Sequence, residues 1–106
     1  MSIRYIAEQD GTSEREFKRA VVALLKRLQI SATAYLVQID RGQGSTPSVA
    51  LCIATAASGT LQKLLTDKVT FIFANMFSED EHLDIVFVDR DARDAIEMVS
   101  VPFYVA

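Results

Sequence analysis

The chain has 106 residues, of which 50% are apolar and 24% are charged, the balance of one soluble globular domain. Its net charge of −3 gives no basic surplus, which argues against a nucleic-acid partner. No apolar run approaches the ~20 residues that cross a bilayer, and the N-terminal residues lack the apolar core of a secretory signal. The single cysteine, Cys52, cannot form an internal disulfide. We therefore expect a cytoplasmic domain without a membrane partner.

The first third of the chain predicts a short strand and a long helix. Residues 3–7 alternate loosely between apolar and polar, as a short strand does. Ser13 and Glu16 then form an S-x-x-E capping box, which predicts the start of a helix. Apolar residues follow from Phe17 to Leu28 at spacings of three and one. This stripe predicts an amphipathic helix of about four turns.

The middle of the chain predicts two strands and a second helix. Residues 33–40 and 48–55 alternate, and a turn segment separates them. A second helix is expected to start at Ser58. Residues 69–73 are rich in β-branched and aromatic side chains, so a strand remains an alternative for that part.

The last third predicts a strand, a short helix and an extended tail. An acidic loop, residues 78–82, precedes the most regular strand pattern of the chain, residues 83–88. Asp89 is a suitable N-cap for a short helix that ends near Met98, and residues 101–105 form an extended tail. The order βαββαβ predicts an α+β fold, a ferredoxin-like two-layer sandwich with an antiparallel sheet, its helices on one face, and an extra short C-terminal helix and tail.

Three segments resemble the C-terminal domain of the enhanced serine sensitivity (SseB) proteins. They are the strand Ala34-Tyr35-Leu36-Val37-Gln38-Ile39, the strand Leu83-Asp84-Ile85-Val86-Phe87-Val88 and the tail Val101-Pro102-Phe103-Tyr104. The resemblance runs from about residue 11 to the end, and it implies that residues 1–106 form a single domain of this type. Members of the family carry a further N-terminal domain, which this sequence does not contain. The resemblance implies no catalytic residues.

Two surfaces are candidates for partner binding. The middle strands are apolar on both faces, whereas a sheet covered on one side is expected to turn polar residues to water. We predict an interface on the second face, where the tail folds over it or a homodimer or another protein covers it; its residues are Leu36, Ala50, Cys52, Ala54, Val86 and Val88. A second surface for an anionic partner is predicted on the first helix, opposite its apolar stripe, from Arg15, Lys18, Arg19 and Lys26.

The chemistry-bearing residues do not form an evident catalytic set. The acidic loop with His82 and Asp84 has no established metal-ligand spacing, and residues 42–46 lack the lysine of a phosphate loop. Cys52 lies among small apolar residues, which disfavours a reactive thiolate. We therefore expect no metal, no cofactor and no catalysis. The predicted function is an interaction or assembly module that self-associates, with small-metabolite sensing as the alternative and an enzyme as the least favoured class.

Overall fold

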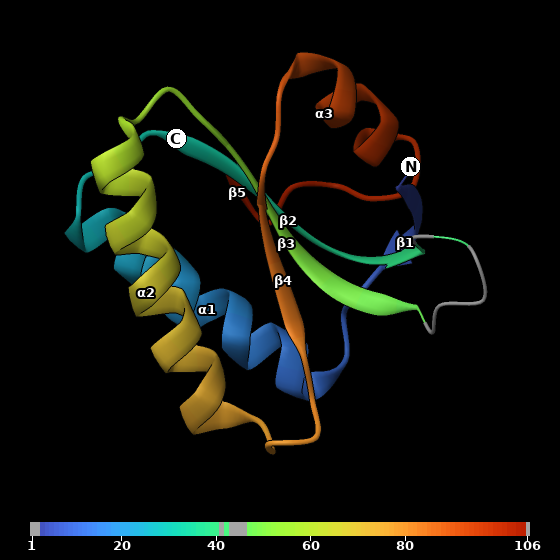
Figure 1. Ribbon diagram of the computed structural model, residues 1–106, viewed down its shortest axis with the longest axis horizontal. Coiled ribbons are helices and arrows are strands. Elements are labelled where there is room, and N and C mark those ends of the chain that lie inside the picture. Colours follow the sequence, from blue (N-terminus) through green and yellow to red (C-terminus); the bar gives the residue numbers. More distant parts are fainter. Residues whose placement is uncertain (1–2, 41, 43–46, 106) are drawn as a thin grey trace.

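A computed structural model describes residues 3–40, 42 and 47–105 of the chain. Eight elements follow one another in the predicted order, with one short strand added at the end (Figure 1). They are β1 (Arg4–Glu8), α1 (Thr12–Arg27), β2 (Ala32–Asp40), β3 (Ser48–Thr55), α2 (Gly59–Met76), β4 (Leu83–Phe87), α3 (Arg90–Glu97) and β5 (Tyr104–Val105). The fold is α+β, as predicted. None of the helices in the described ranges is long and apolar enough to cross a membrane.

The five strands form one mixed sheet with the order β1-β2-β3-β4. β2 pairs antiparallel with β3 along one side. On its other side, β2 pairs antiparallel with β1 through residues 37–40 and with β5 through residues 33–34. β3 and β4 run parallel, and α2 connects them. The first and last strands therefore share one side of β2, and β4 is the outermost strand on the far side of the sheet.

The prediction of an antiparallel, ferredoxin-like sheet is wrong in two respects. The pair β3 and β4 is parallel, and the strands that a helix joins, β1 with β2 and β3 with β4, are direct neighbours. In a ferredoxin-like split βαβ unit, another strand lies between the two strands that a helix joins. The alternation within each segment identifies a strand but does not identify its neighbour, so the same element order fits both topologies.

Helices cover both faces of the sheet, so the fold has three layers where two were predicted. In Figure 1, α1 and α2 lie on one side of the sheet and α3 lies on the other. Leu36, Leu51 and Ile53 face α1 and α2, where they join the larger core. Tyr35 and Cys52 belong to a smaller core on the other face, which also contains Ile96 of α3. A helix on each face explains why the middle strands are apolar on both sides.

The start of α1 lies two residues earlier than predicted. Gly11 is its N-cap, and the Gly11 N–H donates to Glu14 Oε1 over 3.0 Å. This is the carboxylate half of a capping box, and it uses Glu14 where Glu16 was expected.

The end of α1 is a Schellman motif, which fixes the turn into β2. The Ile30 N–H donates to the Leu25 carbonyl over 3.0 Å, and the Gln29 N–H donates to the Lys26 carbonyl over 3.1 Å. Gln29 takes the left-handed conformation of this motif, with φ of 55°. Ile30 and Leu25 are both buried in the larger core. Their burial closes the end of the helix onto the sheet.

The other two helices begin at the predicted caps. The Ser58 hydroxyl accepts from the Leu61 N–H over 3.3 Å at the start of α2, and Asp89 Oδ1 accepts from the Ala92 N–H over 2.9 Å at the start of α3. Residues 69–73 are helical, so the strand alternative for this part of α2 is wrong. Val69 is buried in the larger core, which shows why its branched side chain is accommodated in a helix.

Candidate ligand-binding cleft

A cleft of about 570 Å³ opens where α1 begins and α2 ends, at one end of the sheet. Its walls come from both helices, at the start of α1 with the turn before it and at the end of α2, from strands β2, β3 and β4, and from the loop between α2 and β4. This volume lies within the range of small-molecule sites. The lining side chains are Gln9, Glu14, Phe17, Leu36, Pro47, Ser48, Val49, Phe73, Phe77, Asp80, Glu81, His82 and Leu83.

Three phenylalanines from two helices form the apolar part of the cleft. Phe17 of α1 meets Phe73 and Phe77 edge-on, with ring centroids 5.7 and 6.0 Å away. Phe73 and Phe77 stack on each other with centroids 4.6 Å apart. Phe17 is buried, and the other two rings are partly exposed to the cleft. Phe17 belongs to the apolar stripe that predicts α1, but this spacing does not show that its ring meets two aromatic rings at the end of α2.

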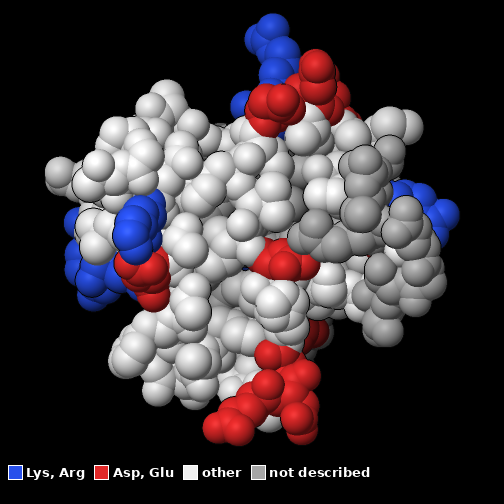
Figure 2. Space-filling view, in the orientation of Figure 1, with Lys and Arg blue, Asp and Glu red and all other residues white. Residues whose placement is uncertain are grey.

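The polar part of the cleft carries three carboxylates. Glu14, Asp80 and Glu81 line it, and no lysine or arginine is among its lining residues in the part of the chain that the structure describes. In the view of Figure 2, acidic side chains gather at the lower end, where Figure 1 places the loop between α2 and β4. Beside this loop, His82 Nε2 lies 2.8 Å from Asp84 Oδ1, and the Ser48 hydroxyl donates to Asp84 Oδ2 over 3.1 Å. The cleft therefore combines an aromatic wall with an acidic mouth.

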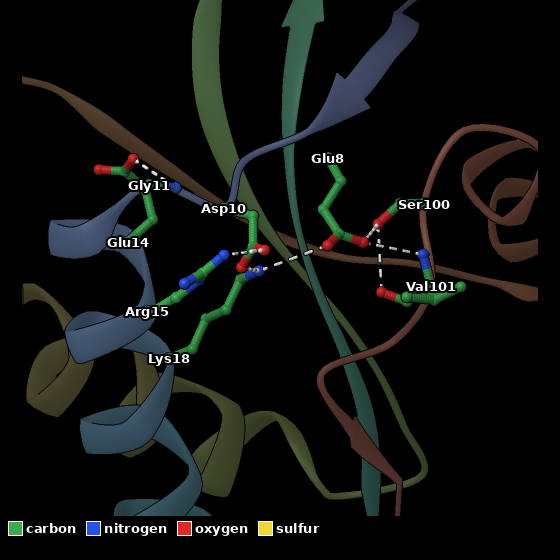
Figure 3. A network of polar contacts seen from close by, with 8 residues as sticks. All are labelled: Glu8, Asp10, Gly11, Glu14, Arg15, Lys18, Ser100 and Val101. Carbon is green, nitrogen blue, oxygen red and sulfur yellow. Dashed lines mark hydrogen bonds and ion pairs between the residues drawn. The ribbon is translucent and has the colours of Figure 1, made fainter.

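A network of charged groups holds the start of α1 beside the cleft (Figure 3). Lys18 is only 8% exposed, and its ammonium group lies 3.1 Å from Asp10 Oδ1 and 3.7 Å from Glu8 Oε2. Arg15 forms a second ion pair with Asp10, at 3.2 Å. Donation from Arg15 and Lys18 lowers the pKa of the Asp10 carboxyl below its usual value. Because Gln9 and Glu14 flank these residues in the chain, the network fixes their positions in the wall of the cleft.

The same network reaches the segment after α3. Glu8 Oε1 accepts from the Ser100 hydroxyl over 2.9 Å and from the Val101 N–H over 3.0 Å. Figure 3 shows Glu8 between this segment and Lys18. One carboxylate therefore joins β1, α1 and the tail.

The predicted cationic surface on α1 does not form as one face. Arg15 and Lys18 turn toward β1, where Asp10 and Glu8 partner their charges. Lys18 also lies over the Phe103 ring, 5.8 Å from its centroid. Arg19 and Lys26 are exposed. Helical spacing alone puts Lys18 on the exposed side of α1. It does not reveal that the end of β1 and the tail pack against that side.

The predicted sheet-face interface is divided between the two sides of the sheet. Leu36 pairs with Leu51 across β2 and β3 and faces α1 and α2, away from the other predicted residues. Ala50 and Cys52 face α3 and are fully buried. Ala54, Val86 and Val88 are partly exposed. The tail extends the sheet as β5 and packs Phe103 and Tyr104 against the larger core, so α3 is the element that covers this face.

Burial beneath α3 favours the neutral forms of two side chains of the sheet, Tyr35 and Cys52. The Tyr35 hydroxyl donates to Glu97, and Arg93 Nε donates to the Tyr35 hydroxyl over 3.4 Å. Burial raises the pKa of the Tyr35 hydroxyl. Burial also raises the pKa of the Cys52 thiol to about 12, so the thiol is protonated at neutral pH. Cys52 therefore acts as a small core side chain in this conformation.

The sequence disfavoured two further kinds of site, a metal site in the acidic loop and a phosphate loop at residues 42–46. Residues 3–40, 42 and 47–105 contain no group of three or more His, Cys, Asp or Glu side chains that could hold a metal ion. The phosphate-loop comparison concerned residues 42–46, of which only Gly42 is described, with φ of 80°. The Gly42 N–H donates to Asp40 Oδ1 over 2.8 Å, which is a local turn contact.

Comparison of the chain with protein-family models, with curated proteins and with solved structures gave no match. We therefore infer the function from the cleft and from the exposed surfaces.

Proposed function

We propose that the protein binds a small organic cation, an aromatic or aliphatic group that carries a protonated amine, in the cleft between α1 and α2. The observation that carries this proposal is the stack of Phe73 and Phe77 beside a mouth of carboxylates. Ligand sites combine apolar walls with a few polar groups that orient the ligand, and this cleft has that composition.

Charge selects the class of ligand. Glu14, Asp80 and Glu81 attract a cation, and no lysine or arginine among the described lining residues offsets them. Aromatic faces also attract cations through their quadrupoles. A ligand carboxylate would be repelled by the same groups. The cleft therefore favours an amine over a free amino acid, which carries both charges.

This proposal takes precedence over assembly through the sheet face. Ala50 and Cys52 lie under α3, and Leu36 faces the opposite side, so a partner would have to displace a helix to reach that surface. The resemblance to the SseB C-terminal domain and the expectation of a non-catalytic, cytoplasmic protein stay predictions.

Thermal unfolding with two matched probes tests the proposal. Phenethylamine and phenylacetate have similar apolar bodies and opposite charges. At 100 times its dissociation constant, a ligand stabilises the native state by about 2.7 kcal/mol, which is a Tm shift of roughly 10 °C or more for a domain of this size. We expect phenethylamine to raise the Tm and phenylacetate to leave it unchanged. Equal shifts would contradict the selectivity for cations, and no shift with either probe would contradict binding.

A pair of double variants locates the site. Asp80→Asn with Glu81→Gln removes two charges from the mouth and should weaken amine binding several-fold. The control, Asp91→Asn with Asp94→Asn, removes two charges from α3, outside the cleft lining, and should not change it. Serine belongs in the same panel, because selective stabilisation by serine would favour amino-acid sensing over the amine proposal.

A further inference from the structure

The outermost strand, β4, presents free backbone groups along one side. β4 pairs with β3 alone among the described residues, and all five of its residues are partly exposed. The Val88 N–H, just past its end, donates to the Ile53 carbonyl of β3 over 2.9 Å. Backbone groups alternate in direction along a strand, so Asp84 and Val86 also point to β3. Leu83, Ile85 and Phe87 therefore turn their N–H and carbonyl groups outward.

Two exposed apolar side chains of α2, Leu64 and Phe71, lie near this edge, with the exposed Lys68 between them on the same side of the helix. Phe73 contacts α1 through Phe17, at 5.7 Å. Phe71 precedes Phe73 by two positions, so it lies about 200° around the helix, on the side of α2 away from α1. Leu64 lies two turns before Phe71 on the same side. Phe71 is 70% exposed and Leu64 is 41% exposed. Since α2 contacts both α1 and β4, we place these two side chains on the side of α2 from which a partner at the free edge of β4 would approach.

The residues of β4 are complementary to a second copy of themselves. In an antiparallel pair centred on Ile85, Ile85 lies opposite the partner's Ile85, and Leu83 lies opposite the partner's Phe87. These are the residues whose backbone groups point outward, so each can exchange hydrogen bonds with its counterpart. Asp84 lies opposite the partner's Val86, so the two acidic side chains do not face each other directly.

We propose that two copies of the protein associate through β4 and form one continuous sheet across a two-fold axis at Ile85. The same axis brings the two α2 helices side by side on one face of that sheet, where Leu64 and Phe71 of each copy meet the other helix. An extended peptide would satisfy the backbone groups of β4, but it would leave Leu64 and Phe71 exposed. A second copy covers both features with a single self-complementary contact. β4 also lacks the proline, lysine or bulge that commonly blocks edge pairing.

Analytical ultracentrifugation over a concentration series tests this dimer. We expect a concentration-dependent dimer, and Phe71→Glu should raise its dissociation constant at least about tenfold, because a charge then replaces an aromatic contact. The control is Met98→Glu, since Met98 is 85% exposed on the far side of the sheet, after α3. This control should dimerise like the unaltered protein.

Amide hydrogen exchange identifies the surface without any substitution. The N–H groups of Leu83, Ile85 and Phe87 should exchange more slowly as the protein concentration rises, while those of Asp84 and Val86 should be slow at every concentration. A monomer at all concentrations would overturn the proposal and leave the edge to an extended segment of another protein. A dimer in which the exchange of Ile85 and Phe87 does not depend on concentration would also overturn it, because that dimer would use another surface. The dimer and the amine cleft stand on separate observations, so either result leaves the other unaffected.

Discussion

The hydroxyl of Tyr35 donates a hydrogen bond to the carboxylate of Glu97, which joins the centre of the sheet to α3 across 62 positions of the chain. Tyr35 is fully buried, and its hydroxyl is the polar end of a side chain that otherwise packs in the smaller core. Ile96 is the only fully buried side chain of α3. The contacts that attach α3 to the sheet therefore include the burial of Ile96 and the hydrogen bonds of Glu97 and Arg93 with the Tyr35 hydroxyl.

Replacing Tyr35 by Phe should loosen α3. The loss of the hydrogen bond to Glu97 is expected to cost about 1 kcal/mol in the free energy of unfolding. Cys52 lies in the same small core, so its reaction with a thiol reagent should become faster as α3 separates more often from the sheet. The measurement is the labelling rate under native conditions. Tyr104→Phe is the control, because Tyr104 packs on the opposite face of the sheet, the one that α1 and α2 cover. Equal rates in both variants would contradict the role of the Tyr35 hydroxyl.

Stability should fall at alkaline pH. The folded state raises the pKa of Cys52 from 9.0 to about 12 and also raises the pKa of Tyr35, so it favours both neutral forms. Their contribution is fully present below the pKa values of the unfolded chain, and it is lost as the pH rises above about 9 toward the folded values. Urea unfolding between pH 8 and 11 measures this loss. In Cys52→Ala, the decline with pH should be shallower, and an unchanged slope would show that the thiol does not contribute.

Replacing Lys18 by Met should destabilise the protein more than an exposed lysine substitution does. Met keeps most of the aliphatic chain but leaves Glu8 and Asp10 without their shared cation. We expect a loss of about 1 kcal/mol, because both carboxylates lose a partner, although Asp10 keeps Arg15 and Glu8 keeps its hydrogen bonds from Ser100 and Val101. Lys63→Met is the matched control, because Lys63 forms an exposed pair with Asp67 at 3.4 Å and should lose no more than about 0.5 kcal/mol. Equal losses in urea unfolding would mean that the Lys18 network adds no stability.

A glycine at position 29 should stabilise the end of α1. Gln29 has φ of 55°, a left-handed conformation that costs a residue with a Cβ roughly 1 kcal/mol. Glycine adopts it without that cost, although its greater freedom in the unfolded chain offsets part of the gain. We expect a net increase of about 0.5 kcal/mol in the free energy of unfolding by urea. Gln38→Gly, in the extended strand β2, should instead be destabilising. A loss of stability in Gln29→Gly would contradict the strain argument.

The sequence was sufficient to predict the elements but not their neighbours. Periodicity located β3 at its observed bounds, and the caps Ser58 and Asp89 located the starts of α2 and α3. These signals act within a few residues, so a sequence reading detects them directly. Strand order depends on contacts between distant segments, which alternation does not encode.

The candidate sites also depend on contacts between distant segments, which the sequence pattern does not show. Leu36 was assigned to the wrong face because the register that pairs it with Leu51 is set between two strands and not within either one. The cleft was not predicted, because Phe17 and Phe73 are far apart in the chain and each reads as an ordinary core residue of its own helix. The sequence also does not show that Lys18 has two acidic partners, because those contacts form only where α1 packs beside the end of β1.

The shared side of β2 has a consequence for how the protein is made. β1 occupies one half of that side, and β5 occupies the other, with the Phe103 N–H donating to the Ala34 carbonyl over 2.9 Å. During synthesis, the hairpin of β2 and β3 and the α2–β4 unit emerge long before β5 does. Ala34 and Thr33 therefore keep an unpaired edge on the ribosome, which a neighbouring nascent chain can occupy. Residues 101–105 therefore complete this side of β2 only after the other described elements have been synthesised.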